Sequence, residues 1–236
     1  MIRVLIIDDE RHAREEMEAL LSETGEVEVV NSCENAFDAL KAINQHRPDV
    51  VFLDIQMPMV NGFELLSMVN QDIMPHVVFV TAYDEYSLKA FEEKTLDYIL
   101  KPVSIERINK TVAKLKELLV TAQPVAFEAE EIKRIPCLIG KRIKLIGLDK
   151  VEFVSTGTRG HYLVTSEDEY YTDITLKVLE ERTNLIRCHK QYLVNMDFVN
   201  EIALLENGLG VITTSSDGSV PVSRMYLKKI KSMLLL

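Results

Sequence analysis

Polar residues with the chemistry for phosphoryl transfer follow four short apolar runs in the first half of this sequence. In chain order these residues are Asp8 with Asp9, then Asp54, Thr81 and Lys101. An unpaired carboxylate is costly to bury, so Asp54 should lie at the open end of its strand, where a cation can meet it. Carboxylate oxygens with open positions suit Mg²⁺, which keeps several of its waters. With Mg²⁺ and the Lys101 ammonium neutralising charge and Thr81 donating a hydrogen bond, Asp54 could act as an exposed carboxylate nucleophile for a phosphoryl group.

Each of these residues also has a simpler interpretation. Asp54 can cap the loop that follows it, as aspartate often does, and Lys101 can be an ordinary surface lysine. The combination favours the functional interpretation, because the carboxyl ends of parallel strands meet at one edge of a sheet, where ligands bind. Several carboxylates at one edge repel each other unless a cation joins them.

The hydrophobic pattern of the first half alternates between segments typical of strands and segments typical of helices. Apolar runs of strand length, which suit strands buried on both faces of a parallel sheet, occur at Val4–Ile7, Val27–Val30, Val50–Leu53, Val77–Val80 and Tyr98–Leu100. Helical patterns lie between the runs, and Ser104 can cap a last helix whose apolar positions run from Ile105 to Leu115. Strand–helix alternation repeated five times predicts an α/β fold with a doubly wound, five-stranded parallel sheet.

The length of 236 residues allows two domains, and the hydrophobic pattern of the sequence changes near residue 120. Neither helical nor strand periodicity continues through residues 120–133, and Pro124 would break a helix there. We therefore predict a first domain over residues 1–119, a linker over 120–133 and a second domain over 134–236.

The second domain should be mostly antiparallel sheet. Its segments are rich in Val, Ile, Thr and Tyr, and Asn207-Gly208 and Asp217-Gly218 are the residues that two-residue hairpin turns require. Two short helical patterns, Leu176–Arg182 and Tyr226–Leu234, interrupt the strands.

Bulk composition is that of a folded protein, with 47% hydrophobic and 27% charged residues. No stretch approaches the roughly 18 consecutive apolar residues of a membrane span, and the N-terminus turns acidic too soon for a signal peptide. The cysteines, Cys33, Cys137 and Cys188, have neither metal nor disulfide spacing. These features predict a cytoplasmic protein.

The acidic excess of the chain belongs to its first half. Residues 1–123 hold 12 Lys and Arg against 22 Asp and Glu, whereas residues 124–236 hold 15 of each. The overall acidity therefore does not exclude nucleic-acid binding by the second half.

The first half resembles the receiver domain of two-component response regulators. The residues that carry the resemblance, in the family's order over residues 1–119, are Asp8-Asp9, Asp54-Ile55-Gln56-Met57-Pro58, Gly62, Thr81-Ala82 and Lys101-Pro102. The resemblance implies that Asp54 accepts phosphate from a histidine kinase, and that Asp9, Asp54 and the Gln56 backbone carbonyl hold Mg²⁺, with Asp8 assisting through water. It also implies that Thr81 and Tyr98 form a switch pair and that the Lys101–Pro102 peptide bond is cis.

An alternative is a Mg²⁺-dependent phosphohydrolase with an aspartyl nucleophile. Such enzymes typically place a second acid two residues after the nucleophile, to protonate the leaving group and activate water. Gln56 stands at that position and can do neither. A phosphoryl group on Asp54 should therefore persist as a signal, which predicts a stoichiometric phosphoacceptor with self-limited dephosphorylation rather than an enzyme.

Residues 134–236 resemble the LytTR DNA-binding domain. The segments that carry the likeness are Val151–Ser155, Leu185–Asn195 and Pro221–Lys229. The resemblance implies a small β domain that reads double-stranded DNA with loops, and it places His161, Lys190 and Arg224 at the groove. Lys190 departs from the Asn or Arg that relatives often carry there.

Further basic residues are candidate phosphate contacts, namely Arg159, Lys228 and Lys229. The small residues of Ser155–Gly160 would let the backbone approach a groove. Alternatively, the basic residues form a solvated face, or the domain binds RNA or a protein. Tyr162, Tyr170 and Tyr171 could stack on bases, but on β-segments tyrosines are more often core residues or cross-strand pairs; His189 is expected to be structural.

Together the two resemblances predict a transcriptional response regulator. A membrane sensor kinase of the LytS class would phosphorylate Asp54, and Thr81 and Tyr98 would then reorganise the face built by strands four and five. A receiver homodimer would form and place two output domains on direct repeats in promoter DNA. The whole chain resembles the BtsR-like group of enteric regulators, which is linked to pyruvate sensing.

Overall fold

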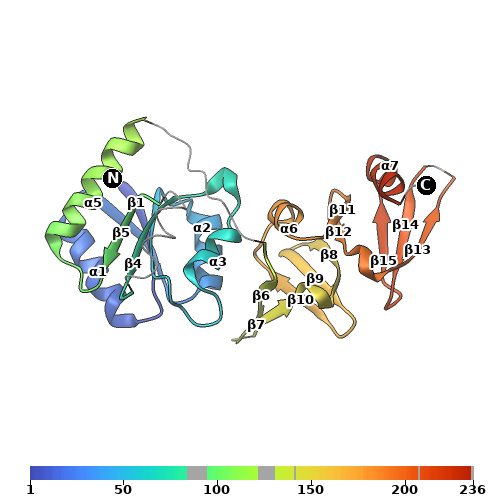
Figure 1. Cartoon of the computed structure of the whole chain (residues 1–236), viewed down its shortest axis with the longest axis horizontal. Coiled ribbons are helices and arrows are strands. Elements are labelled where there is room, and N and C mark those ends of the chain that lie inside the picture. The colour runs from blue at the N-terminus through green and yellow to red at the C-terminus, as the bar shows by residue number, and fades with distance from the viewer. Residues whose placement is uncertain (84–94, 122–130, 141, 207, 235–236) are drawn as a thin grey trace. The chain divides into compact units, whose positions relative to one another are not determined.

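The computed structural model divides the chain into two compact units, Met1–Glu130 and Glu131–Leu236, and each is described by itself. The structure describes residues 1–83, 95–121, 131–140, 142–206 and 208–234. Figure 1 shows the helices and strands of both units. Within the described ranges, no helix combines the length and the apolar character that crossing a lipid bilayer requires.

The first unit is built around a five-stranded parallel sheet. Its strands are β1 (Ile2–Ile7), β2 (Val27–Cys33), β3 (Val50–Leu53), β4 (His76–Thr81) and β5 (Asp97–Leu100). Their spatial order, β2-β1-β3-β4-β5, confirms the predicted doubly wound sheet, and every predicted apolar run lies within a strand. β3, near the centre of the sheet, is buried at all of its positions because helices cover both faces.

The α-helices in the described part of this unit are α1 (Arg11–Glu23), α2 (Ala36–His46), α3 (Gly62–Ser67) and α5 (Ile105–Thr121), with a 3₁₀ turn at Gln71–Ile73. α1 and α5 cover one face of the sheet, and α2 and α3 cover the other (Figure 1). Ser104 caps α5 as predicted, since its hydroxyl accepts a hydrogen bond from the Arg107 amide at 3.3 Å.

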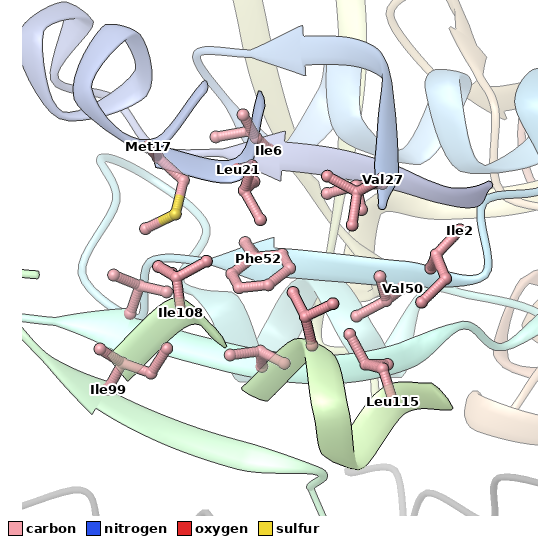
Figure 2. Close-up of a cluster of buried hydrophobic side chains, with 14 residues drawn as sticks. Ile2, Ile6, Met17, Leu21, Val27, Val50, Phe52, Ile99, Ile108 and Leu115 are labelled. Carbon is pink, nitrogen blue, oxygen red and sulfur yellow. The ribbon is translucent and has the colours of Figure 1, made fainter. Parts of the chain in front are cut away.

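The core on the α1 and α5 side packs around Phe52 of β3. Figure 2 shows Leu21 of α1 and Ile108 of α5 beside this ring, with Leu115 of α5 farther along the same cluster. All four side chains are at most 1% exposed. Burial of apolar area contributes roughly 25 cal/mol per Å², and this packing fixes the helices against the sheet and therefore the strand ends that lie beyond them.

The second unit is mostly antiparallel, as predicted. β6 and β7 pair with each other, a five-stranded sheet has the order β10-β9-β8-β12-β11, and a three-stranded sheet has the order β13-β14-β15. The strands are β6 (Arg134–Ile139), β7 (Arg142–Gly147), β8 (Val151–Gly157), β9 (Gly160–Thr165), β10 (Glu169–Thr172), β11 (Ile186–His189), β12 (Tyr192–Val194), β13 (Val199–Leu204), β14 (Gly210–Thr214) and β15 (Ser219–Val222).

Two helices and two 3₁₀ turns complete the described part of this unit. α6 (Leu176–Arg182) has its predicted bounds, and α7 (Arg224–Met233) begins two residues earlier than predicted. The 3₁₀ turns are Leu148–Lys150 and Met196–Phe198. Leu227 of α7 is buried in one cluster with residues of β11, β14 and β15, so α7 is packed onto the strands.

The two hairpin turns of the three-stranded sheet are longer than predicted. In the β14–β15 turn the Thr214 amide donates to the Gly218 carbonyl at 2.9 Å, which leaves three residues in the loop instead of two. Asp217 takes the left-handed conformation at φ 59°, which aspartate tolerates. The β13–β14 turn has the same bonding, with Gly208 at φ 76°, while Asn207 lies outside the described residues. A type I turn closed by a left-handed residue accounts for the extra position.

The predicted linker, residues 120–133, lies only partly within the described residues. α5 continues through Thr121, and residues 122–130 are not among those described. Ile132 is 4% exposed, and its amide donates to the Arg182 carbonyl at 2.9 Å. The chain therefore joins the second unit before Arg134, and the exact linker bounds stay a prediction.

Candidate functional site

Asp54 and Asp8 occupy neighbouring strand ends at the carboxyl edge of the parallel sheet. The Asp54 amide donates to the Ile7 carbonyl at 2.8 Å, and the Asp8 amide donates to the Cys33 carbonyl at 3.1 Å. These bonds fix where each carboxylate leaves the sheet. The prediction that Asp54 is exposed is wrong, because Asp54 is only 7% exposed and Asp8 only 5%. A buried carboxylate needs a partner, and the structure supplies one.

That partner is Lys101, which follows β5. Its Nζ lies 2.7 Å from Oδ2 of Asp8 and 3.0 Å from Oδ2 of Asp54. The Lys101 amide donates to the Thr81 carbonyl at 2.9 Å, which ties the start of this loop to β4. The Lys101–Pro102 peptide bond is cis, as predicted. The predicted meeting of an ammonium with two carboxylates at one edge is therefore present.

The electrostatics of this group follow from burial. Burial raises the pKa of the Asp8 carboxyl, against the opposing effect of its hydrogen bond with Lys101. For Lys101, burial alone would lower the pKa, but the hydrogen bonds to Asp8 and Asp54 outweigh it and raise the pKa. Lys101 is therefore a cation at neutral pH, and further positive charge beside Asp8 would favour its ionised form.

The acidic residues fit a divalent cation. One carboxylate oxygen each of Asp8, Asp9 and Asp54 lies within 4.8 Å of the others. Asp9 is exposed, so this side of the group is open to water. The Gln56 amide donates to Oδ1 of Asp54 at 3.3 Å, which places the Gln56 peptide beside the same carboxylate. An oxygen-only donor set with one open side suits Mg²⁺ better than a soft metal.

Thr81 ends β4 at the same edge and has an unusual environment. It is wholly buried, and within the described residues its Oγ1 has no hydrogen-bond partner. Tyr98, the other predicted switch residue, is half-buried on β5 and donates its hydroxyl hydrogen to the Tyr83 carbonyl. The two side chains therefore have separate environments in this structure.

Gly62, the first residue of α3, lies so close to the backbone of Asp54 and Ile55 that only glycine fits there. A Cβ at Gly62 would lie 2.7 Å from the Asp54 carbonyl oxygen and 3.2 Å from Cα of Ile55. The Gly62 amide donates to the Ile55 carbonyl at 2.8 Å, so α3 begins directly against the Asp54 loop. Any side chain here would displace either the helix or the Asp54–Ile55 backbone.

Arg14 was not among the predicted site residues. Its Nη1 donates to the Asp8 carbonyl at 2.8 Å and to the Asp9 carbonyl at 3.2 Å. The guanidinium, on the first turns of α1, thus holds the backbone of both acidic residues. The available signal in the sequence was an arginine one to two helical turns after an Asp-Asp pair, which is weak by itself.

The predicted DNA-facing residues lie on connected hairpin ends of the second unit. His161 follows the β8–β9 turn, with Nδ1 3.1 Å from Oγ1 of Thr156. The Thr156 amide donates to the Gln191 carbonyl at 2.9 Å. This bond joins the β8–β9 hairpin to the β11–β12 turn, which carries the exposed Lys190.

Arg224 reaches the same edge through a second backbone bond. The Ser223 amide donates to the Cys188 carbonyl at 3.0 Å, so α7 starts beside β11. Arg224 is exposed, as are Lys228 and Lys229 farther along α7 and Arg159 in the β8–β9 turn, all of which were predicted contacts. The structure thus brings His161, Lys190 and Arg224 to one edge, which we call the hairpin edge.

The small residues before His161 have a packing role. A Cβ at Gly157 would lie 2.7 Å from the Tyr162 ring, and one at Gly160 would lie 2.7 Å from the Tyr171 ring. Tyr162 and Tyr171 are cross-strand partners with ring centroids 5.8 Å apart, in agreement with the prediction that the tyrosines are core residues or members of cross-strand pairs. The His189 ring centroid lies 5.7 Å from that of Tyr192, a contact that agrees with the predicted structural role.

Comparison with known proteins identifies the class that this fold and site define. Residues 4–113 match the response regulator receiver domain, and residues 141–235 match the LytTr DNA-binding domain. An uncharacterized response regulatory protein of Vibrio cholerae is 50% identical over 234 residues, which cover 99% of both chains. The chain therefore belongs to the response regulators, and within them to those that join a receiver domain to a LytTR DNA-binding domain. The transcriptional regulatory protein BtsR of Escherichia coli K12 is 44% identical over 238 residues, again 99% of both chains.

Solved structures match each unit separately. The response regulatory domain of mrkE from Klebsiella pneumoniae is 33% identical, with a TM-score of 0.47, and covers 51% of this chain and 99% of its own. A LytTr DNA-binding domain from Bacillus cereus is 17% identical, with a TM-score of 0.42, and covers 44% of this chain and 99% of its own.

Proposed function

We propose that Asp54 accepts a phosphoryl group from a sensor histidine kinase and that this modification controls promoter binding by the second unit. In this proposal Asp9, Asp54 and the Gln56 carbonyl hold Mg²⁺, and Asp8 assists through water. The bound ion supplies positive charge against the developing charge of the phosphoryl group. Lys101 supplies a second positive charge from its position directly after β5. The kinase is a membrane protein of the LytS class, and the regulator works in the cytoplasm.

The observation that carries this proposal is the Thr81 hydroxyl. Buried hydroxyls almost always have a hydrogen-bond partner, and one without a partner is costly. Thr81 has none within the described residues, although its own carbonyl accepts the Lys101 amide. A phosphoryl oxygen on Asp54 would supply the missing acceptor.

The same hydrogen bond gives phosphorylation a way to change conformation. A modification shifts an equilibrium only through interactions that are better in one of the two states. Donation from Thr81 to a phosphoryl oxygen favours the state in which the end of β4 is drawn toward Asp54. Tyr98 would then leave the Tyr83 carbonyl, and the face formed by β4 and β5 would change.

The altered face would favour a homodimer of receivers. Two linked output units bind two half-sites more tightly than one unit binds one, because the second binding event becomes intramolecular. His161, Lys190 and Arg224 would face the grooves of directly repeated promoter sites, and Arg159, Lys228 and Lys229 would contact phosphates.

Dephosphorylation should be slow. Gln56, whose backbone amide donates to the Asp54 carboxylate, has a neutral side chain that cannot act as a general base toward water. The phosphoryl group would therefore persist long enough to act as a signal, in contrast to a phosphohydrolase that turns over.

Intact-mass spectrometry after incubation with acetyl phosphate and Mg²⁺ tests the first step. The wild-type chain should gain the mass of one phosphoryl group, and Asp54→Asn should gain none. Release of many equivalents of inorganic phosphate per chain, with no adduct at any time, would overturn the proposal and favour the phosphohydrolase.

A further inference from the structure

Arg187 lies next to the turn that carries Lys190 in the hairpin edge, and its own side chain is mostly buried. The side chain, on β11, is 12% exposed. Its Nε donates to Oε2 of Glu180 on α6 at 2.9 Å, and its Nη1 donates to the Lys190 carbonyl at 3.3 Å. One guanidinium therefore connects α6 to the turn that carries Lys190. Such a buried fork is poorly placed to contact a phosphate itself but well suited to fix two acceptors.

The charge of Arg187 also reaches His161 on the neighbouring hairpin. Burial lowers the pKa of His161, and the positive charge of Arg187 lowers it further, whereas Asp173 after β10 raises it. Among the described residues, Arg187 and Asp173 are the charged groups that shift the pKa of this ring. His161 is consequently neutral at neutral pH, with Nδ1 engaged by Thr156 on β8.

We propose that Arg187 is the positioning residue of the hairpin edge, because its guanidinium joins Glu180 of α6 to the turn that carries Lys190, and a backbone hydrogen bond joins that turn to the hairpin of His161. This inference rests on the proposed DNA-binding role. A neutral imidazole with Nδ1 engaged leaves Nε2 as the nitrogen that can meet a base edge. Lys190 and His161 are thereby presented together by one side chain that touches no DNA.

Two substitutions in the full-length chain separate the two parts of this role. Arg187→Gln removes both the charge and the fork, so the pKa of His161 should rise and the amides of Lys190 and Gln191 should exchange hydrogen faster. Arg187→Lys keeps the charge but lacks the guanidinium fork, so it cannot bond to Glu180 and to the Lys190 carbonyl at the same time. The amide exchange should therefore accelerate while the pKa of His161 stays unchanged. Arg142→Gln, on an exposed arginine of β7, is the matched control and should change neither.

NMR titration of the His161 ring and amide hydrogen exchange measure both effects without DNA. Gel-shift titrations with promoter DNA should show an affinity loss of about tenfold for Arg187→Gln, on the order of one or two lost hydrogen bonds. The pH at which DNA binding by Arg187→Gln changes should also rise, because the pKa of His161 rises in this variant.

Unchanged His161 titration and unchanged exchange in Arg187→Gln would refute the positioning role, whether or not the protein binds DNA. An unchanged titration together with a salt slope reduced by about one would also refute it, since that result indicates a direct phosphate contact. If Arg187→Gln does not fold, Arg187→Lys decides, and slow exchange in that variant counts against the proposal. If the NMR changes occur but no DNA sequence is bound, the positioning role holds and the proposed function fails.

Discussion

Lys101 and Asp8, 93 positions apart in the chain, form an ion pair with 2.7 Å between Nζ and Oδ2. The same ammonium lies 3.0 Å from Asp54. One cation thus lies between two buried carboxylates and reduces their repulsion, but it does not balance both charges, and burial still raises the pKa of Asp8.

Replacing Lys101 should therefore harm stability as well as phosphorylation. In Lys101→Gln the two carboxylates lose their shared cation, and we expect a loss of roughly 2 kcal/mol in the free energy of unfolding, discounted because Lys101 is partly exposed. Saturating Mg²⁺ should restore part of this loss, since the proposed ion site includes the same carboxylates. Thermal unfolding with and without Mg²⁺ measures both effects. Lys110→Gln, an exposed position on α5, is the control, and equal behaviour of the two variants would contradict the prediction.

Thr81 and Thr111 form a matched pair for testing the unpartnered hydroxyl. Both are wholly buried, but Thr111 donates to Oδ2 of Asp97 at 2.6 Å, whereas Thr81 Oγ1 has no partner within the described residues. Thr111→Val should cost about 1–3 kcal/mol, and Thr81→Val should cost nearly nothing or stabilise the resting chain. Chemical denaturation measures the difference.

The phosphorylated state should reverse this order. Thr81→Val should still accept phosphate on Asp54, yet lose the phosphorylation-dependent increase in DNA affinity, which gel shifts with acetyl phosphate can follow. A normal response in Thr81→Val would remove Thr81 from the switch.

Arg14 should support Mg²⁺ binding without touching the ion. It holds the carbonyls of Asp8 and Asp9, and loss of such outer support typically costs 10–100-fold in metal affinity. We expect Arg14→Gln to weaken Mg²⁺ binding by about tenfold in calorimetric titrations. Arg11→Gln removes an equal charge from an exposed position of α1, and a similar loss in this control would show that net charge is responsible instead.

Asp97 should make the first unit sensitive to acid. Burial opposes its ionisation, but hydrogen bonds from Arg107, Thr111 and Lys114 outweigh burial and hold the pKa of Asp97 well below its usual 3.8. Because the folded-state pKa is depressed, this stabilisation is present above about pH 4 and is lost as pH falls through the folded-state value.

The corresponding variant is Asp97→Asn. It should lose about 2 kcal/mol at neutral pH, after discounting for the partly exposed cations, and should converge with the wild type in acid. Hydrogen exchange of β5 amides across a pH series checks the convergence, and the exposed Glu18→Gln provides the control. A difference that stays constant with pH would contradict the assignment.

Arg224 and Lys228 should affect DNA binding in different ways. Loss of a side chain that reads a base edge typically costs about 1–3 kcal/mol at one position of the site. Arg224→Ala should accordingly lower affinity for the specific promoter more than for unrelated DNA. Lys228→Ala should weaken both alike and reduce the salt slope by about one. Fluorescence-polarisation titrations across salt concentrations distinguish these outcomes, and no sequence-dependent binding by the wild type would favour RNA or a protein as the ligand.

The sheet of the first unit was predictable because each strand leaves a local signal. Apolar runs marked all five strands, and the polar residues after four of them then had to lie at one edge. The burial of Asp54 was not predictable in the same way, because it depends on Lys101 arriving from a strand 47 positions away. The unpartnered Thr81 and the backbone contacts of Arg14 likewise appear only when distant segments are in place.

The second unit shows where local signals fail. Asn-Gly and Asp-Gly marked both turns but not their length, since one extra residue in a left-handed conformation satisfies the same pairing. Resemblance pointed to His161, Lys190 and Arg224, but Thr156 and Arg187, which hold two of them, carry no signal of their own in the sequence.

The hairpin edge is assembled from separate segments rather than carried on one rigid rod. His161 and Lys190 lie on hairpins of one continuous sheet, in which β8 pairs with β12, and Arg224 begins α7, which the Ser223–Cys188 backbone hydrogen bond joins to β11. The turns can therefore be altered in length or sequence while the strand pairing that anchors the others remains. In a surface of this kind, substitutions in one turn can change the target preference while the other turns keep their positions. A single recognition helix does not allow this, because all of its side chains share one axis.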